Sequence, residues 1–247
     1  MKWSKTRSFG QHFLIHKRIL EKIVRSSQIN EKEVVCEVGT GNGILTTELC
    51  KYAQLVVSFE IDKVLYQKAL KLSSSFSNLK LINMDIFNVN DLQFDVFVSN
   101  LPYSRSKDAI EWLAVQEFDR AIVMLQKEFV SKLQAKPGET NYRAISVIGQ
   151  YCFDIKKLFE VGRASFEPKP KIDSQVIKLI PNKDVNITAQ IISTLNFIFS
   201  LRNKRASSVS ENLGAKFDYS SNIRIDELDP IDLIELAKSI NKKEVDR

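Results

Sequence analysis

The sequence predicts an α/β protein, with a doubly wound, mostly parallel sheet followed by a small all-helical domain. Between residues 34 and 180, short runs rich in β-branched and aromatic residues alternate with longer amphipathic segments, a pattern typical of successive β-α units. The short runs are almost continuously apolar, as expected for strands covered on both faces. After residue 181 no strand-like run follows, and the apolar residues have helical spacing.

The expected elements follow one another in a regular order along the chain. Strands are predicted at Val34–Val38, Leu55–Phe59, Leu79–Ile82, Asp95–Ser99, Ala121–Leu125, Asp154–Val161 and Ser174–Ile180. Helices are predicted at Ile44–Lys51, Lys63–Leu72, Lys107–Val115, Lys127–Gln134, Ile187–Leu201 and Pro230–Ile240. We therefore expect a sheet domain over residues 1–180, opening with a basic segment at 1–30, and a helical domain over 181–247.

Composition excludes several classes of protein. Of the 247 residues, 44% are hydrophobic and 27% are charged, which excludes a disordered or fibrous chain. Cys36, Cys50 and Cys152 form no C-x-x-C pair, so neither a disulfide framework nor a zinc site is expected. His12 and His16 have no third ligand nearby in the sequence, and we expect no metal. Without a membrane-length apolar run or a signal peptide, a cytoplasmic protein is expected.

The positive charge is concentrated at the start of the chain. The first 30 residues contain seven Lys and Arg residues and one Glu, so their net charge is +6. This equals the net charge of the whole chain. Such a cluster favours contact with a polyanion through Lys5, Arg7 and Arg18, although a solvated tail is the alternative. Helical apolar spacing after Arg18 favours a docked helix. Arg202 and Arg205 in the helical domain either complement a helix C-terminus or contact nucleic acid.

The first strand leads into a glycine-rich turn. Gly39, Gly41 and Gly43 follow this strand and precede a helix, and glycine allows a tight turn that a ligand can approach closely. The next residue is Ile44, which breaks the Gly-x-Gly-x-x-Gly fingerprint of dinucleotide binding. The chain also has no phosphate-binding P-loop motif. The turn therefore predicts a ligand site without requiring a pyrophosphate.

Acidic residues follow the second and third strands. Glu60 can accept hydrogen bonds from both hydroxyl groups of a ribose, and Asp85 can accept one from the amino group of an adenine. Because these residues and the glycine turn end three successive strands, they predict an adenosyl ligand. S-adenosylmethionine is the common ligand of this kind without a pyrophosphate.

The fourth strand runs into Asn100-Leu101-Pro102-Tyr103, the NLPY segment. The exocyclic amine of adenine is a weak nucleophile because its lone pair is delocalised into the ring. The Asn100 side-chain carbonyl and the Leu101 main-chain carbonyl can accept from that amine and free the lone pair for attack on a sulfonium methyl. Pro102 stiffens the turn, and Tyr103 offers a face on which a base can stack.

Together these motifs resemble the small-subunit ribosomal RNA adenine dimethyltransferases of the KsgA type, over nearly the whole chain. The matching segments are Gly10–Leu14, Glu37–Gly43, the NLPY segment, Met124–Glu128, Phe166–Ser174 and Arg224–Pro230. The resemblance implies a class I S-adenosylmethionine-dependent methyltransferase sheet. It also implies transfer of two methyl groups to each of two adjacent adenosines near the 3′ end of small-subunit ribosomal RNA, with a role in ribosome biogenesis.

The resemblance also implies roles for individual residues. Cofactor contacts are expected from the N-terminal motif and the strand ends, namely Gln11, His12, Leu14, Gly39, Gly41, Glu60, Ile61, Asp85, Ile86 and Asn100. Phe166 would stack on the target base opposite Tyr103. The implied partner is small-subunit ribosomal RNA or the immature subunit, bound by a monomer.

Some features depart from the family or leave alternatives open. The family usually continues the NLPY segment with Asn-Ile-Ser, whereas here Ser104-Arg105-Ser106 follows, and Arg105 could contact a phosphate. A large-subunit methyltransferase of the erythromycin-resistance type shares most motifs, but Asp173 favours the small-subunit group. A methylation-silent RNA-binding assembly or transcription factor is a further alternative. DNA adenine methyltransferases typically have Asp-Pro-Pro-Tyr, with which Asn100-Leu101 disagrees.

Overall fold

A computed structural model of the protein describes residues 12–89, 92–183, 185–215 and 222–245. The chain divides into two compact units, which we describe separately. The first contains the described residues within Met1–Ala109, Gln116–Lys127 and Asp154–Pro181, and the second contains those within Ile110–Val115, Glu128–Phe153 and Asn182–Arg247. The predicted division at residue 181 coincides with the last of these breaks and stays a prediction for the rest of the chain.

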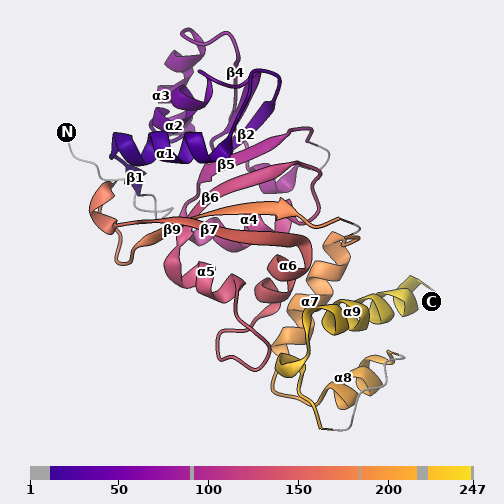
Figure 1. Ribbon diagram of the computed structural model, residues 1–247. Helices are drawn as coiled ribbons and strands as arrows, with labels where there is room; N and C mark the ends of the chain where they lie inside the picture. Colours follow the sequence, from indigo (N-terminus) through magenta and orange to yellow (C-terminus); the bar gives the residue numbers. More distant parts are fainter. Residues whose placement is uncertain (1–11, 90–91, 184, 216–221, 246–247) are drawn as a thin grey trace. The chain divides into compact units, whose positions relative to one another are not determined.

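A seven-stranded sheet forms the centre of the first unit (Figure 1). Its order is β4 (Leu79–Ile82), β3 (Leu55–Phe59), β2 (Val34–Val38), β5 (Val96–Asn100), β6 (Arg120–Gln126), β9 (Ser174–Pro181) and β7 (Phe153–Val161). The strands from β4 to β6 are parallel, whereas β9 pairs antiparallel with β6. This arrangement confirms the predicted doubly wound sheet. The chain order reverses beside β2, where such sheets bind ligands at the strand carboxyl ends.

The strands form because their side chains are buried on both faces. Val96, Phe97 and Val98 in β5 are fully buried, as are Ile122 and Val123 in β6. Such continuous burial stabilises the sheet by roughly 1.5–3 kcal/mol for each large apolar side chain. The central strands are therefore a rigid base for the loops at their carboxyl ends.

The helices of the first unit are α1 (Lys17–Ser27), α2 (Ile44–Leu49) and α3 (Lys63–Ser73), with α4 (Ser106–Leu113) beginning here. Among them, α3 begins at a side-chain cap, whereas α1 and α2 begin without one. Asp62 caps α3 by accepting from the main-chain N–H groups of Val64 and Leu65 at 2.7 and 3.1 Å. Helix α1 ends at Gln28, which has a φ of 51°. Short 3-10 turns occur at Ile86–Asn88, Tyr103–Arg105 and Arg163–Ser165.

The second unit is helical. Its helices are α5 (Lys127–Leu133), α6 (Ala144–Cys152), α7 (Ala189–Ser200), α8 (Ala206–Leu213) and α9 (Pro230–Val245), with a 3-10 turn at Ile225–Glu227. At its centre the fully buried Tyr142 donates to the main-chain oxygen of Leu228 at 3.0 Å, and its ring meets the Phe199 ring edge-on. This confirms the predicted C-terminal helical region. Helices α6 and α8 were not predicted.

Two very short strands bring distant segments together in the first unit. Strand β1 (Phe13–Leu14) pairs antiparallel with β8 (Phe166–Glu167), so the segment before α1 is held beside a loop more than 150 residues away. Two-residue strands have too little pattern to be predicted from sequence. None of the helices in the described part of the chain has both the length and the apolar character needed to cross a membrane.

Candidate active site

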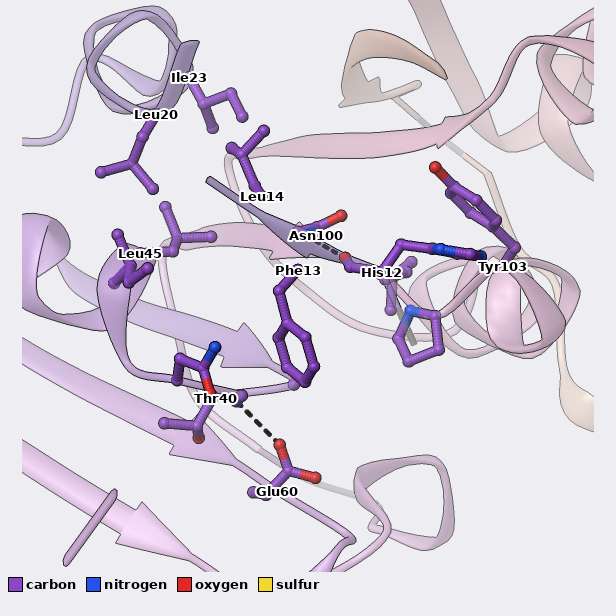
Figure 2. A pocket seen from close by; sticks show the side chains of 16 residues that line it. His12, Phe13, Leu14, Leu20, Ile23, Thr40, Leu45, Glu60, Asn100 and Tyr103 are labelled. Carbon is purple, nitrogen blue, oxygen red and sulfur yellow. Dashed lines mark hydrogen bonds between the residues drawn. The ribbon is translucent and has the colours of Figure 1, made fainter. Parts of the chain in front are cut away.

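The carboxyl ends of β2, β3, β4 and β5 carry the residues that the sequence singled out. The glycine turn follows β2, Glu60 follows β3, Asp85 lies beyond β4, and Asn100 is the last residue of β5. Because neighbouring strands in this order are parallel, their ends lie at one edge of the sheet. Figure 2 shows several of these side chains around one pocket.

The glycine turn needs its glycines for backbone conformation and for space. Gly39, Gly41 and Gly43 have φ values of 83°, 55° and 75°, in the left-handed region that other residues rarely adopt. A Cβ on Gly43 would lie 2.1 Å from the side chain of Leu72, and one on Gly41 would lie 3.3 Å from the ring of Phe13. The turn is therefore packed closely on both sides.

A buried polar network supports the start of the glycine turn. Oε2 of Glu37, at 0% exposure, accepts from the hydroxyl groups of Thr46 at 2.7 Å and Ser58 at 2.6 Å. The Ser58 hydroxyl is also 2.6 Å from that of Thr40. The other carboxyl oxygen, Oε1, is buried without a hydrogen-bond partner. Burial raises the pKa of Glu37 to about 7.

Glu60 links the glycine turn to the end of β3. One carboxylate oxygen accepts from the main-chain N–H of Gly41 and the other from that of Asp62, both at 2.9 Å. Glu60 is only 2% exposed, and this burial raises its pKa although the two N–H groups oppose the shift. Each oxygen of an ionised carboxylate has a second lone pair. Glu60 can therefore still accept from a pair of ligand hydroxyls.

Two cavities meet at Glu60. The first, about 710 Å³ including solvent at its mouth, lies between the segment before α1, the glycine turn and the NLPY segment. The second, about 480 Å³ on the same basis, is bordered by the ends of β3 and β4 and includes Ile61, Asp85 and Ile86. Both cavities share Gly39, Glu60 and Pro102 in their linings. A ligand with a ribose at its centre and a group on each side fits this pair.

The second cavity offers apolar surfaces with a carboxylate at its border. Ile61 is 43% exposed, Ile86 is buried, and both contribute apolar surface together with Phe87. Asp85 accepts from the main-chain N–H of Phe87 at 3.2 Å. These residues fit the flat apolar faces and the amino edge of an adenine ring.

Arg105 lies at this second cavity and not on an open surface. Its Nη2 donates to both carboxylate oxygens of Asp85, at 3.1 and 2.9 Å, and its Nε lies 2.7 Å from a carboxylate oxygen of Asp108. The guanidinium group would have to leave these carboxylates to reach a phosphate. The phosphate contact of Arg105 stays a prediction, and the structure places its guanidinium group beside two carboxylates.

The NLPY segment borders the first cavity with all four residues. Asn100 donates from its Nδ2 to the main-chain oxygen of His12 in a long hydrogen bond of 3.4 Å (Figure 2). Because the amide nitrogen is used in this way, the carbonyl oxygen is the part of the Asn100 amide left for a substrate. Leu101 is 2% exposed as a whole residue and still lines the cavity.

Tyr103 is held in place from two sides. Its hydroxyl lies 2.6 Å from that of Ser174, and its ring centroid lies 5.2 Å from that of His12. Burial raises the pKa of the Tyr103 hydroxyl. The ring is only partly covered. Tyr103 is therefore an ordered aromatic surface at the cavity.

The segment before α1 forms one wall of the first cavity. His12, Phe13 and Leu14 line it, and Nδ1 of His12 lies 2.6 Å from the main-chain oxygen of Pro168. Figure 2 shows the Phe13 side chain extending from this wall toward Thr40 and Glu60. The sequence motifs did not predict a role for Phe13. Its position inside the Gly10–Leu14 motif could have indicated a role in the site.

Phe166 does not face either cavity. It is 3% exposed and lies in the hydrophobic core cluster that includes Leu14, its partner across the β1–β8 pair. Stacking on a base would require part of this ring to become accessible, and the role of Phe166 in base stacking stays a prediction.

The remaining predicted contacts lie away from the cavities or outside the described residues. Arg18 is exposed on α1, and Arg205 is exposed at the start of α8 in the second unit, where Arg202 is partly buried. Lys5, Arg7 and Gln11 lie outside the described residues. Within the described ranges, no group of three His, Cys, Asp or Glu side chains could hold a metal ion.

Comparison with known proteins agrees with this geometry. Residues 3–244 match the family model described as ribosomal RNA adenine dimethylase. The "Ribosomal RNA small subunit methyltransferase A" of Sulfurihydrogenibium sp. is 36% identical over 242 residues, covering 92% of this chain and 93% of that protein. The "Probable ribosomal RNA small subunit methyltransferase A" of Pyrococcus abyssi is 36% identical over 187 residues, or 75% and 69% of the two chains.

Solved structures show the same fold. A dimethyladenosine transferase from Plasmodium falciparum superposes with a TM-score of 0.76 at 26% identity, covering 94% of this chain and 98% of that one. The 23S rRNA methyltransferase ErmE gives a TM-score of 0.63 at 20% identity, over 93% and 99% of the two chains. The sheet is thus a class I methyltransferase sheet. By its sequence match and its fold, the chain belongs to the ribosomal RNA adenine dimethylase family.

Proposed function

We propose that this protein transfers methyl groups from S-adenosylmethionine to the exocyclic amines of two adjacent adenosines near the 3′ end of small-subunit ribosomal RNA. The observation that carries the proposal is the position of the NLPY segment. Its residues border a cavity that shares Glu60 in its lining with a second cavity. A methyl donor and an acceptor amine can therefore meet beside Asn100.

The two cavities support S-adenosylmethionine as the cofactor. Glu60 would hold the ribose hydroxyls, Asp85 would accept from the adenine amino group, and the glycine turn would border the amino-acid part. When bound, the cofactor supplies an electrophilic methyl group on a sulfonium. The apolar side chains of Ile61 and Ile86 would cover the faces of the adenine ring.

The NLPY segment would activate the acceptor amine. The Asn100 side-chain oxygen and the Leu101 main-chain oxygen accept from its two N–H groups, which favours tetrahedral nitrogen with a free lone pair. Tyr103 stacks against the base, as aromatic side chains do with unpaired bases. The first transfer leaves S-adenosylhomocysteine and an aminium nitrogen, which is acidic and releases one proton to water. The methylated amine then keeps one N–H group, and one of the two carbonyl oxygens can still accept from it. The same residues can therefore serve both transfers.

The ribosomal substrate is supported by the relatives and by charge. The two relatives described above carry the name small-subunit methyltransferase A, and Asp173 is the residue expected in the small-subunit group. Exposed cations on α1, including Arg18, provide sequence-independent attraction for RNA phosphates. We propose that a cytoplasmic monomer acts on the immature small subunit during ribosome biogenesis.

Replacement of Asn100 by alanine tests the proposed chemistry. Asn100→Ala should abolish methyl transfer from labelled S-adenosylmethionine to immature small-subunit particles, because one of the two amine acceptors is lost. Affinity for S-adenosylhomocysteine should change by less than about tenfold, or about 1.4 kcal/mol. Nucleoside mass spectrometry measures the dimethyladenosine product, and calorimetry measures the affinity.

Asn182→Ala is the matched control. The Asn182 amide also donates to a main-chain oxygen, that of Tyr151 at 2.9 Å, but it lines neither cavity. This variant should keep both turnover and cofactor affinity. Normal turnover by Asn100→Ala would show that the catalytic assignment is wrong. If the wild-type protein bound the particles but transferred no methyl group, the alternative of an RNA-binding factor without methyltransferase activity would be favoured.

A further inference from the structure

Arg105 and Asp85 form an ion pair at the border of the second cavity. The guanidinium Nη2 reaches both carboxylate oxygens, and the guanidinium carbon lies 4.7 Å from the centroid of the Phe87 ring. The side chains are only 27% and 23% exposed. A charge-assisted contact at such partial burial is ordered more strongly than one in open solvent. The pair is therefore part of the cavity wall.

This pair joins the loops that follow two different strands. Asp85 lies in the loop after β4, whereas Arg105 ends the 3-10 turn that begins at Tyr103, the last residue of the NLPY segment. The main-chain N–H of Arg105 donates to the oxygen of Pro102 at 2.8 Å, so the guanidinium position depends on that segment. The proposed adenine acceptor and the proposed catalytic segment are thus connected through a single side chain.

The contacts also determine what Asp85 can still bind. An ionised carboxylate offers about four acceptor positions. Two are used by the Nη2 of Arg105 and one by the main-chain N–H of Phe87, which fixes the orientation of the group. The remaining position can accept a hydrogen bond from an amino group of a ligand. A ligand carbonyl oxygen in the same place has no hydrogen to donate, so it would be repelled by the carboxylate and would leave that position unpaired.

We infer that Arg105 is a positioning residue for cofactor recognition, which holds Asp85 as an oriented, acceptor-only carboxylate so that the second cavity selects a 6-amino purine over a 6-oxo purine. The inference rests on the proposed function, because it assumes an adenosyl ligand. It is an alternative to the expected phosphate contact of Arg105, because the guanidinium group already contacts Asp85 and Asp108.

Binding of two ligands that differ in the purine tests this role. Calorimetry would measure the dissociation constants of S-adenosylhomocysteine and its 6-oxo analogue, S-inosylhomocysteine. The wild-type protein should prefer the amino form by at least about a hundredfold, because a site built around an N–H group rejects a ligand lacking it. Arg105→Met should reduce this ratio at least about tenfold, since Asp85 loses its strongest hydrogen-bond donor.

Two further variants separate positioning from general charge. Lys107→Met makes the same kind of change two residues away, at an exposed position that lines neither cavity, and should leave the ratio unchanged. Arg105→Lys should restore part of the preference, because an ammonium group also pairs with Asp85 but holds it at fewer points. A purely structural role would lower affinity for both ligands equally and leave the ratio intact.

Failure of the inference about Arg105 can be distinguished from failure of the proposed function. Tight S-adenosylhomocysteine binding with an unchanged ratio in Arg105→Met would overturn the inference and leave the methyltransferase proposal standing. If that variant kept the ratio but bound ribosomal RNA more weakly, the phosphate contact would be the correct role. Failure of the folded wild-type protein to bind S-adenosylhomocysteine would overturn both proposals.

Discussion

The carboxyl group of Glu37 lies at the end of β2 with one oxygen hydrogen-bonded and the other buried without a partner. Removing a charged carboxylate from water is costly unless it is fully paired. The neutral form is therefore favoured, and the pKa of Glu37 rises to about 7. Glu37 itself lines neither cavity, so its protonation affects the stability of the base of the glycine turn.

This burial predicts a pH-dependent stability that Glu37→Gln should remove. The folded protein keeps a proton that the unfolded chain, with a pKa near 4.5, has already released. The stabilising contribution is therefore complete below pH 4.5 and is lost as the pH rises to about 7. The free energy of unfolding of wild type, relative to Glu37→Gln, should fall by roughly 3 kcal/mol across this range.

Urea unfolding at several pH values measures this difference. Other titrating groups act equally on both proteins, so their effects cancel in the comparison. A difference between wild type and Glu37→Gln that stays constant from acid to neutral pH would show that Glu37 is charged in the folded protein.

At the residue scale, the sequence predicted positions better than partners. The glycine turn, Glu60 and the NLPY segment could be located because each follows an apolar strand run. The ion pair of Arg105 with Asp85 joins residues 20 positions apart, and the burial of Phe166 depends on its pairing with the start of the chain. Such contacts depend on tertiary structure and leave no local pattern.

At the element scale, Arg120 attaches the end of α1 to the start of β6. Its guanidinium donates to the main-chain oxygens of Ser27 and Gln28 and to both carboxylate oxygens of Glu33, at 2.6–2.9 Å. Both charged side chains are 13% exposed, and the hydrogen bonds from Arg120 lower the pKa of Glu33. Helix α1 follows the wall segment of the first cavity, so this attachment fixes one border of the site.

Breaking this attachment should destabilise the protein strongly. Arg120→Met should lower the free energy of unfolding by about 3 kcal/mol, because it leaves Glu33 charged and without its partner. Arg25→Met is the control, since that side chain is 81% exposed and its loss should cost less than about 0.5 kcal/mol. Thermal and urea unfolding measure both, and equal effects would contradict the structural role of Arg120.

Helices α6 and α8 show why some elements escaped prediction. Seven of the nine residues of α6 are buried, so it lacks the polar face that produces a helical period. Helix α8 is short and rich in serine, which favours turns in isolation. The strands and most of the longer amphipathic helices, by contrast, lie close to their predicted bounds, although α9 continues to Val245, beyond its predicted end at Ile240. Helices could be predicted from the sequence where they have one apolar face and one polar face.

At the scale of the whole molecule, the fold class and the family were predictable because several motifs agree in order and spacing. The division into units was less predictable, because segments 110–115 and 128–153 belong to the same unit as residues far along the chain.

The positive charge of the N-terminal region predicted an RNA contact only in part. Arg18 lies on a formed helix, which excludes the tail alternative for that residue, while Lys5 and Arg7 lie outside the described residues.

Cells that lack the gene offer a test of whether this chain dimethylates adenosine in small-subunit ribosomal RNA through its NLPY segment. Nucleoside mass spectrometry of their ribosomal RNA measures the product. Dimethyladenosine should disappear from the small-subunit RNA, and the wild-type gene should restore it whereas Asn100→Ala should not. Unchanged dimethyladenosine in the small subunit, or its loss from large-subunit RNA alone, would show that the proposed function is wrong.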